Sequence, residues 1–195
     1  MNATLVSTVS PHFSSSALGK FTIIVGGTIL LTISAKVQVP FWPVPMTMQT
    51  FVVLVMAMAC GPVIGGNVMA VYLVEGALGF PVFSGTPERA SGLVYLMGPT
   101  GGYLAGMLFA SLVCGWLSIC GWGRSALTTL LAMLIGTFII FLSGYLWLAM
   151  SIGPMKAWTF GVVPFLLSES LKIGLAALLL PVSWSLVGQV KNRRS

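Results

Sequence analysis

The stretch PFLLSESLKIGLAALLLPV, from Pro164 to Val182, decides the class of this protein. It is almost entirely apolar and close to the length of about 20 residues that a helix needs to cross the hydrocarbon core of a bilayer. Two charged residues, Glu169 and Lys172, nevertheless lie inside it, although the whole chain has only three acidic residues. A charged side chain at the centre of a membrane costs about 2.5–3.5 kcal/mol on the insertion scale. The pair therefore predicts a helix that turns one charged face away from lipid.

The composition of the chain agrees with a membrane protein. Of its 195 residues, 57% are hydrophobic and only 6% are charged, whereas soluble domains carry about 25% charged residues. Such a chain cannot cover a surface that faces water, so we expect lipid to be its solvent. The formal net charge of +6 does not indicate a nucleic-acid-binding protein, because the basic residues are scattered and form no patch interleaved with aromatic residues.

The sequence contains no set of residues typical of an enzyme or a metal centre. The three cysteines, Cys60, Cys114 and Cys120, form no C-x-x-C pair, and His12 is the only histidine. There is no Ser/His/Asp group, no H-E-x-x-H and no Walker A loop. We therefore expect no metal, no cofactor and no enzymatic activity, and we expect that the chain cannot power transport with ATP by itself.

Six apolar segments organise the chain. They cover about residues 18–35, 47–60, 62–79, 101–120, 127–150 and 162–187. Gly61-Pro62 separates the second from the third, which together are too long for one span and fit a tight hairpin. We predict an all-α membrane protein, a bundle of six transmembrane helices over residues 18–188. A polar, mobile cytoplasmic tail is expected at residues 1–17 and a basic cytoplasmic tail at 189–195.

The basic residues predict the orientation of this bundle. An even number of spans places both termini on one side, together with Lys20, Arg124, Lys191, Arg193 and Arg194. The basic residues of the other side are Lys36, Arg89 and Lys156. Because cytoplasmic segments carry the excess of Lys and Arg, we expect both termini in the cytoplasm. The loops at residues 38–46 and 80–99 then face outside, and their length favours a ligand that arrives from there.

The Glu169–Lys172 pair is the first candidate for a binding site. At a spacing of i, i+3 the two side chains share one helix face, where they can stabilise each other or hold a polar ligand. The residues alone leave both interpretations open. The other polar side chains expected in the outer half of the bundle are Gln49, Tyr72, Glu75 and Arg89.

The segment GPTGGYLAG, Gly98–Gly106, opens the fourth apolar segment at the outer face. Gly101 and Gly102 leave backbone N–H groups uncovered, and a helix N-terminus favours anions. With Arg89 nearby in the sequence, this helix start is a candidate site for a carboxylate. Gly102 and Gly106 are also four residues apart, a spacing that lets helices approach closely in lipid.

Four motifs together resemble the BioY family: PVPMTMQT (Pro43–Thr50), GALGFPVFSGTPE (Gly76–Glu88), GPTGGYLAG (Gly98–Gly106) and PFLLSESLK (Pro164–Lys172). BioY proteins are the biotin-specific substrate-binding components, or S components, of energy-coupling-factor transporters. The resemblance covers about residues 20–187, with the motifs in the family's order and spacing. The family's last motif usually reads Asp-x-x-Lys after Pro-Phe-Leu-Pro-Gly. Here Glu169 stands for the acid, Leu167-Ser168 stand for Pro-Gly, and Lys172 matches directly.

The resemblance implies a six-helix S-component fold and high-affinity capture of biotin for uptake across the cytoplasmic membrane. It implies the lipid bilayer, a transmembrane coupling protein and two ATPase subunits as partners. Candidates to meet the ureido group of biotin are Glu169, Gln49 and Glu75. Candidates to meet its carboxylate are Lys172, Arg89 and the helix start at Gly101 and Gly102. Candidates for aromatic walls are Tyr72, Tyr103 and Tyr145.

Two alternatives stay open beside this expectation. One is an S component for another small vitamin, which composition cannot distinguish. The other is an intramembrane enzyme or assembly factor in which the Glu–Lys pair is structural. The sequence also leaves open which end of biotin points in which direction.

Overall fold

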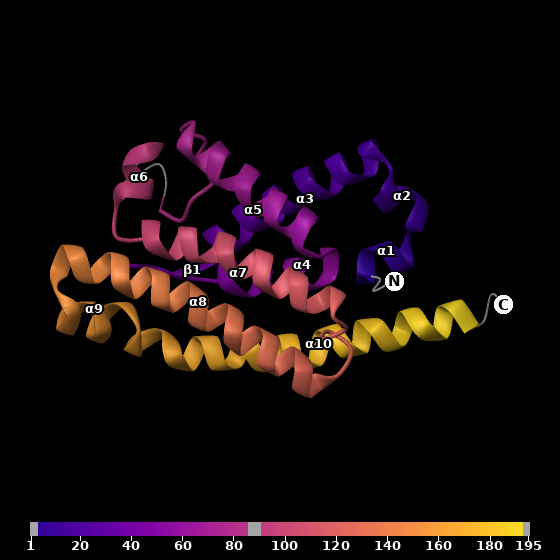
Figure 1. Ribbon diagram of the computed structural model, residues 1–195. Helices are drawn as coiled ribbons and strands as arrows, with labels where there is room; N and C mark the ends of the chain where they lie inside the picture. Colours follow the sequence, from indigo (N-terminus) through magenta and orange to yellow (C-terminus); the bar gives the residue numbers. More distant parts are fainter. Residues whose placement is uncertain (1–3, 86–90, 193–195) are drawn as a thin grey trace.

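The computed structural model describes residues 4–85 and 91–192, with side chains as far as Gln189. It is a bundle of helices with a small two-stranded antiparallel sheet (Figure 1). The elements in chain order are α1 (Leu5–Val9), α2 (Pro11–Ser15), α3 (Ala17–Lys36), β1 (Gln38–Val39), β2 (Met46–Thr47), α4 (Gln49–Cys60), α5 (Pro62–Ala77), α6 (Leu93–Met97), α7 (Gly101–Ile119), α8 (Ala126–Ile152), α9 (Pro154–Gly161), a 3₁₀ turn (Val163–Phe165) and α10 (Leu166–Asn192).

Each of the six predicted apolar segments corresponds to a helix, but the helices differ in length. α3, α7, α8 and the run from α9 through α10 are the four helical segments of the described chain that are long and apolar enough to cross a membrane. α4 and α5 are apolar but have only 12 and 16 residues. At about 1.5 Å per residue, α4 extends over about 18 Å, against about 30 Å for a hydrocarbon core.

Gly-Pro pairs produce two of the sharp turns between helices. Gly61 has a φ of +83° and Gly153 a φ of +85°, a region that residues other than glycine rarely adopt. Pro62 and Pro154 then open α5 and α9, because a proline at the first helical position removes no hydrogen bond that the helix would make. The predicted break between the second and third apolar segments is confirmed.

Two regions differ from the prediction. The residues expected to form a mobile tail contain α1 and α2, and α1 contacts both α4 and α10. Thr4 caps α1 by accepting a hydrogen bond from the backbone N–H of Ser7 at 3.3 Å. The helical run of the sixth apolar segment begins at Pro154 instead of about residue 162. Pro164 lies within the 3₁₀ turn and cannot donate a backbone hydrogen bond, so the run divides there into α9 and α10.

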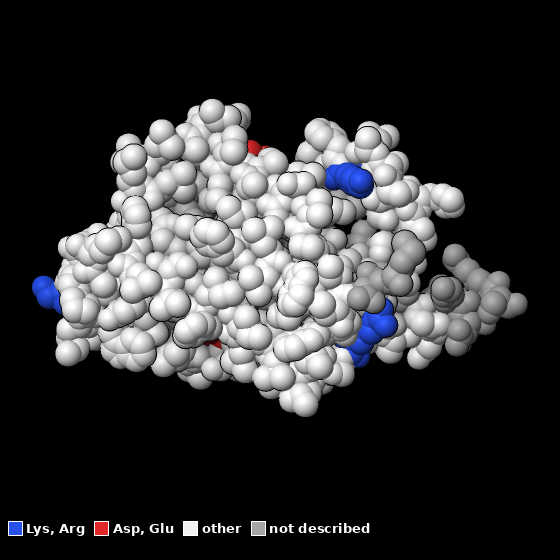
Figure 2. Space-filling model, in the orientation of Figure 1, with Lys and Arg blue, Asp and Glu red and all other residues white. Residues whose placement is uncertain are grey.

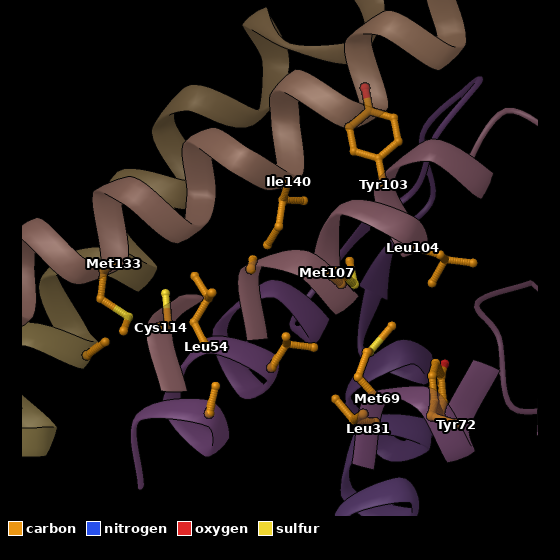
Figure 3. Packing of buried hydrophobic residues seen from close by; sticks show 14 of the residues in the cluster. Leu31, Leu54, Met69, Tyr72, Tyr103, Leu104, Met107, Cys114, Met133 and Ile140 are labelled. Atoms are coloured by element: carbon orange, nitrogen blue, oxygen red, sulfur yellow. The ribbon is translucent and has the colours of Figure 1, made fainter. Parts of the chain in front are cut away.

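α7 occupies the centre of the bundle and contacts α4, α5 and α8. Glycines allow the close approach: a Cβ atom on Gly106 would lie 2.9 Å from the Cα of Ile140. One on Gly102 would collide with the side chain of Trp147. Figure 3 shows buried side chains of α5, α7 and α8, among them Tyr72 and Ile140, turned toward a common interior. The predicted close packing at Gly102 and Gly106 is confirmed.

The surface of the molecule is apolar. Large hydrophobic side chains are exposed along α3, α8 and α10, and charged side chains occupy only a few spots on the face shown in Figure 2. Both described ends of the chain lie at one end of the bundle, whereas β1, α6 and α9 lie at the other (Figure 1). We call the second end, which carries residues 37–48, 78–85 and 91–100, the loop end.

Candidate functional site

Glu169 and Lys172 form an ion pair near the start of α10. Lys172 Nζ lies 2.6 Å from Glu169 Oε1. It also donates hydrogen bonds to the carbonyl of Thr47 at 2.6 Å and to Thr50 Oγ1 at 3.1 Å. An ammonium group has three N–H donors, so Lys172 uses all of them within the protein. Glu169 is buried, with 5% of its surface exposed.

Thr50, in the first turn of α4, completes this arrangement. Its hydroxyl donates to Glu169 Oε1 at 3.0 Å and accepts from Lys172. We call Thr50, Glu169 and Lys172, with the carbonyl of Thr47, the charged cluster. A buried charge is tolerated when it is both paired and hydrogen-bonded, and here the partners come from two helices. The charged cluster therefore ties the start of α4 to α10.

The charged cluster borders a cavity of about 470 Å³ at the loop end, part of which opens to solvent. Sites for small molecules combine apolar walls with a few precisely placed polar groups. The polar residues that line this cavity are Thr47, Gln49, Thr50, Ser84, Thr100 and Glu169. Its aromatic lining consists of Phe83, Tyr95, Tyr103, Phe141 and Phe165. The lining suits a small ring compound with a few polar atoms.

The two ends of the cavity differ in chemistry. Pro45, Tyr95 and Thr100 also line a second pocket formed by the loops, and they mark the outer end of the cavity. Glu169 and Phe141 also line a groove between α8 and α10, and they mark the inner end. The acidic group thus lies at the inner end, and the outer end carries hydroxyl groups.

Gln49 lines the cavity, and its side-chain amide is fixed by a hydrogen bond to Tyr72. Gln49 Nε2 donates to Tyr72 Oη at 2.8 Å, and Tyr72 Oη donates in turn to the carbonyl of Val82 at 2.8 Å. Tyr72 is fully buried and does not line the cavity. Its ring packs edge-on against Phe83, with the centroids 5.4 Å apart. Tyr72 therefore positions two lining residues without lining the cavity itself.

One wall of the cavity comes from the loop between α5 and α7. The ring of Phe83 stacks on Tyr95 with centroids 4.8 Å apart, and Ser84 Oγ lies 2.9 Å from Tyr95 Oη in a hydrogen bond. Lys36, at the end of α3, donates to the carbonyl of Phe83 at 2.9 Å. These contacts attach the aromatic wall to α3 and α6.

The opposite wall comes from α7, α8 and the 3₁₀ turn. Phe141 packs edge-on against both Tyr103 and Phe165, with centroid distances of 5.8 and 5.7 Å. Tyr103 Oη donates to the carbonyl of Gly161 at 2.8 Å. Tyr103, which the sequence suggested as a wall, lines the cavity. Its hydroxyl is already engaged with the end of α9.

The remaining predicted site residues lie away from the cavity lining. Lys172 borders a separate space beside Glu169, and Glu75 is partly exposed on α5. Tyr145 lies in the groove between α8 and α10, where its ring meets that of Trp158.

The glycines at the start of α7 serve packing. A Cβ on Gly101 would collide with the carbonyl of Leu96, and Trp147, which covers Gly102, donates through Nε1 to the carbonyl of Gly98 at 3.0 Å. The predicted role of Gly101 and Gly102 beside a carboxylate stays a prediction. Arg89, which was predicted to lie near them, lies outside the described residues.

Several lining residues were not singled out from the sequence. Thr50 has a local signal, because it directly follows Gln49 in the motif PVPMTMQT. Phe141 and Phe165 have none, because one aromatic residue in an apolar helix resembles any other until the helices are packed.

Within the described part of the chain, no group of three His, Cys, Asp or Glu residues could hold a metal ion.

Comparisons with known proteins agree with the motifs. The family model described as "BioY family" matches residues 6–189. The "Probable biotin transporter BioY" of Pyrococcus horikoshii is 35% identical over 150 residues, which are 77% of this chain and 86% of that protein. The "Biotin transporter BioY" of Thermotoga maritima is 34% identical over 153 residues, 78% of this chain and 88% of that one.

A solved structure shares the fold. It is described as the S-component for biotin from an ECF-type ABC transporter, and it superposes with a TM-score of 0.72. The match covers 83% of this chain and 88% of that chain at 22% sequence identity. The fold of this chain is therefore one that the S-component for biotin also adopts.

Proposed function

The chain belongs to the BioY family, and from this premise we propose that it captures biotin at the loop end and serves as the substrate-specific component of biotin uptake. The observation that carries the proposal is the charged cluster at the inner end of an aromatic cavity of about 470 Å³. Biotin combines a polar ureido ring with an apolar bicycle and arm, so it needs a few polar groups at one end of an otherwise apolar cavity.

The hydrogen bonds of the cluster favour one orientation of the ligand. Lys172 has no donor to spare, whereas among the described residues no partner contacts Oε2 of Glu169. A carboxylate oxygen accepts hydrogen bonds, and a ureido N–H is a donor. The ligand's carboxylate would instead be repelled by a second buried carboxylate. We therefore place the ureido ring at the inner end, beside Glu169, Thr50 and Gln49.

The carboxylate of biotin then lies toward the outer end. Thr100 lines the cavity there and immediately precedes α7. The positive end of a helix dipole attracts anions, so the start of α7 supports a carboxylate at this place. Between the ends, Phe83, Tyr95 and Tyr103 offer the apolar surface that the bicycle and arm require.

In this proposal Lys172 acts through Glu169. Its ammonium keeps the buried carboxylate paired and fixes the rotamer that presents the second oxygen to the cavity. Lys172 is thus a positioning residue and does not itself contact the carboxylate of the ligand. This arrangement also accounts for a lysine that belongs to the charged cluster but does not line the main cavity.

We place the chain in the cell membrane with six crossings and both termini in the cytoplasm. The described chain ends share one end of the bundle (Figure 1). The cavity opens among the loops of the other end, which fits capture from outside. The sequence contains no Walker A loop. Energy for uptake would come from a transmembrane coupling protein and two ATPase subunits.

Calorimetry on the detergent-purified protein tests the proposal. We expect biotin to bind tightly at about one molecule per chain, and we expect riboflavin and thiamine to give no heat of binding at the same concentrations. Binding of another vitamin in place of biotin would assign the chain to a different S component. If none of them binds, the Glu–Lys pair is structural and the proposal is wrong.

A further inference from the structure

An open groove between α8 and α10 measures about 930 Å³ with its open side included. Phe141 and Glu169 line both this groove and the cavity of the proposed ligand, so they separate the two spaces. Glu169 is buried, whereas four apolar residues along the groove are exposed: Leu134, Phe138, Leu142 and Leu166. The groove therefore opens at the surface of the bundle, with Glu169 in its floor.

The surface around the groove faces hydrocarbon. α8 and the run from α9 through α10 are both long and apolar enough to cross a membrane, and large hydrophobic side chains are exposed along them. The hydroxyl of Ser170, which lines the groove, donates to the carbonyl of Leu166 at 2.7 Å and so has a partner in its own helix. Because the bilayer core contains no water and an unfilled groove would lose dispersion contacts, an apolar group must fill the space.

The width of the groove favours an acyl chain over a protein helix. α8 and α10 pack against each other, so the groove lies between touching helices. A helix with its side chains is about 10–12 Å across, and it could cover such a groove without entering it. An acyl chain is a single row of methylene groups. It can enter where the small side chain of Ser170 leaves space on α10.

The length of the groove matches one leaflet of a bilayer. On α8 its lining extends from Leu134 to Tyr145, which at about 1.5 Å per residue is about 16 Å. Half of a hydrocarbon core of about 30 Å is about 15 Å. The groove can therefore hold one chain of a lipid from a single leaflet.

The end of the groove nearest the loops has the features of a membrane–water interface. Tyr145 and Trp158 line it there, with their ring centroids 6.3 Å apart, and Tyr and Trp are enriched at the level of lipid headgroups. Lys156, exposed on α9 two residues before Trp158, brings a positive charge to the same end. That charge complements the phosphate of a phospholipid.

We propose that this groove binds one acyl chain of a phospholipid from the leaflet at the loop end. The phosphate lies near Lys156, and the chain extends inward past Ser170. It covers the groove side of Phe141 and Glu169, so a lipid backs the wall whose other side faces the cavity. The proposal goes beyond the proposed function and does not rest on it.

Photolabelling of the full-length protein in detergent-free nanodiscs tests the groove. The probe is a phosphatidylglycerol with a diazirine halfway along one acyl chain. Photolysed alkyl diazirines react readily with carboxyl groups, so Glu169, which is only 5% exposed, reports a chain that reaches the floor. Mass spectrometry of the digested protein should find an adduct on Glu169. Adducts on exposed residues such as Leu171, with none on Glu169, would overturn the proposal.

Three substitutions on α10 separate the space from the chemistry of Ser170. Ser170→Phe fills the groove and should reduce the Glu169 adduct to background. Ser170→Ala removes the hydroxyl but leaves the space, and should be labelled as the parent is. Leu171→Phe is the matched control, because Leu171 is exposed but does not line the groove. Parental labelling in Ser170→Phe, or loss of labelling in Ser170→Ala, would contradict a chain in this groove. The parent's result holds even if Ser170→Phe does not fold.

The headgroup is tested by moving the same diazirine chain onto a diacylglycerol, which lacks the phosphate. At equal mole fraction it should label Glu169 about fivefold less, the size expected for one lysine near an anionic membrane surface. Lys156→Gln should remove this difference. Equal labelling by the two lipids in the parent would overturn the phosphate contact. A parent that is labelled on Glu169 but fails to bind biotin would reject the proposed function and leave the lipid groove in place.

Discussion

Thr50 and Glu169 are 119 residues apart in the chain and share a hydrogen bond of 3.0 Å. The contact joins the first turn of α4 to the first turn of α10 at the inner end of the cavity. Because Thr50 also accepts a hydrogen bond from Lys172 at 3.1 Å, a single hydroxyl orients both charges. Its removal should therefore affect ligand binding more than a solitary surface hydroxyl would.

Thr50→Val should lower the affinity for biotin by about 10- to 100-fold, which is the usual range for a hydrogen bond to a charged group. The variant should elute from size exclusion in detergent as the parent does, because valine fills nearly the same volume. Calorimetry measures the affinity. The matched control is Thr32→Val, whose hydroxyl only donates to the carbonyl of Thr28 in its own helix. A Thr50→Val variant with parental affinity would show that the cluster is not part of the site.

The charged pair can be tested by one single and one double substitution. Lys172→Ala leaves Glu169 buried without its cation, which should cost about 3–5 kcal/mol of stability and weaken biotin binding severely. Lys172→Met combined with Glu169→Gln removes both charges and nearly preserves the volume. This double variant should keep a parental melting temperature in detergent, yet lose affinity by orders of magnitude. Parental affinity in the double variant would make the pair purely structural.

Gly76 supports the aromatic wall by allowing a ring to approach its backbone. A Cβ atom at this position would collide with the ring of Phe83, which lines the cavity. Gly76→Ala should therefore displace Phe83, destabilise the protein by about 1–3 kcal/mol and weaken biotin binding. Thermal unfolding in detergent and calorimetry measure the two effects.

Gly174→Ala is the control for that experiment, because a Cβ there meets nothing within 4 Å. It lies inside α10, where alanine is favoured over glycine by about 1 kcal/mol. The control should be at least as stable as the parent and bind biotin equally well. Loss of binding in both variants would mean that the effect at Gly76 is not due to Phe83.

Biotin amide should bind far more weakly than biotin. The amide keeps the ureido ring, the bicycle and the arm, but it lacks the negative charge that we place near Thr100 and the start of α7. Competition between the two compounds on the purified protein measures the difference. Equal affinities would contradict an anion site at the outer end and leave the inner end as the sole source of polar recognition.

Membrane orientation can be measured with cysteines. Cys120 is exposed and follows α7 at the end of the bundle that holds the chain termini, and Ser91 is exposed at the loop end. In intact cells, an impermeant maleimide should label a Ser91→Cys variant and leave Cys120 unlabelled until the membrane is permeabilised. The reverse result would place the cavity on the cytoplasmic side.

The parts of the fold that depend on a single apolar segment and its ends can be predicted from the sequence. The runs of apolar residues and the pair Gly61-Pro62 mark helices that the structure contains, because lipid-facing helices need continuous apolar stretches. The small helices α1 and α2 have no such signal. They are short, partly polar and stabilised by contacts of α1 with α4 and α10, which a linear pattern cannot express.

The site is predictable to the extent that it lies on one helix. Glu169 and Lys172 are close in sequence, and the structure pairs them as their spacing suggests. Thr50 and Phe141 join the same region through the packing of α4 and α8 against α10. The spacing therefore predicted the ion pair, but it could not show that Lys172 is fully occupied by Thr47, Thr50 and Glu169.

The shortness of α4 has an electrostatic consequence. A helix about 18 Å long in a hydrocarbon core of about 30 Å must begin or end well inside the membrane, and α4 begins at Gln49, beside the charged cluster. The first turn of a helix carries the equivalent of about half a positive charge, and Thr50 brings that turn against the carboxylate of Glu169. A full-length helix would hold this positive end near the membrane surface, where water would screen it. The positive end of this short helix is thus fixed beside Glu169 and shielded from water, where it favours the negative charge of the carboxylate.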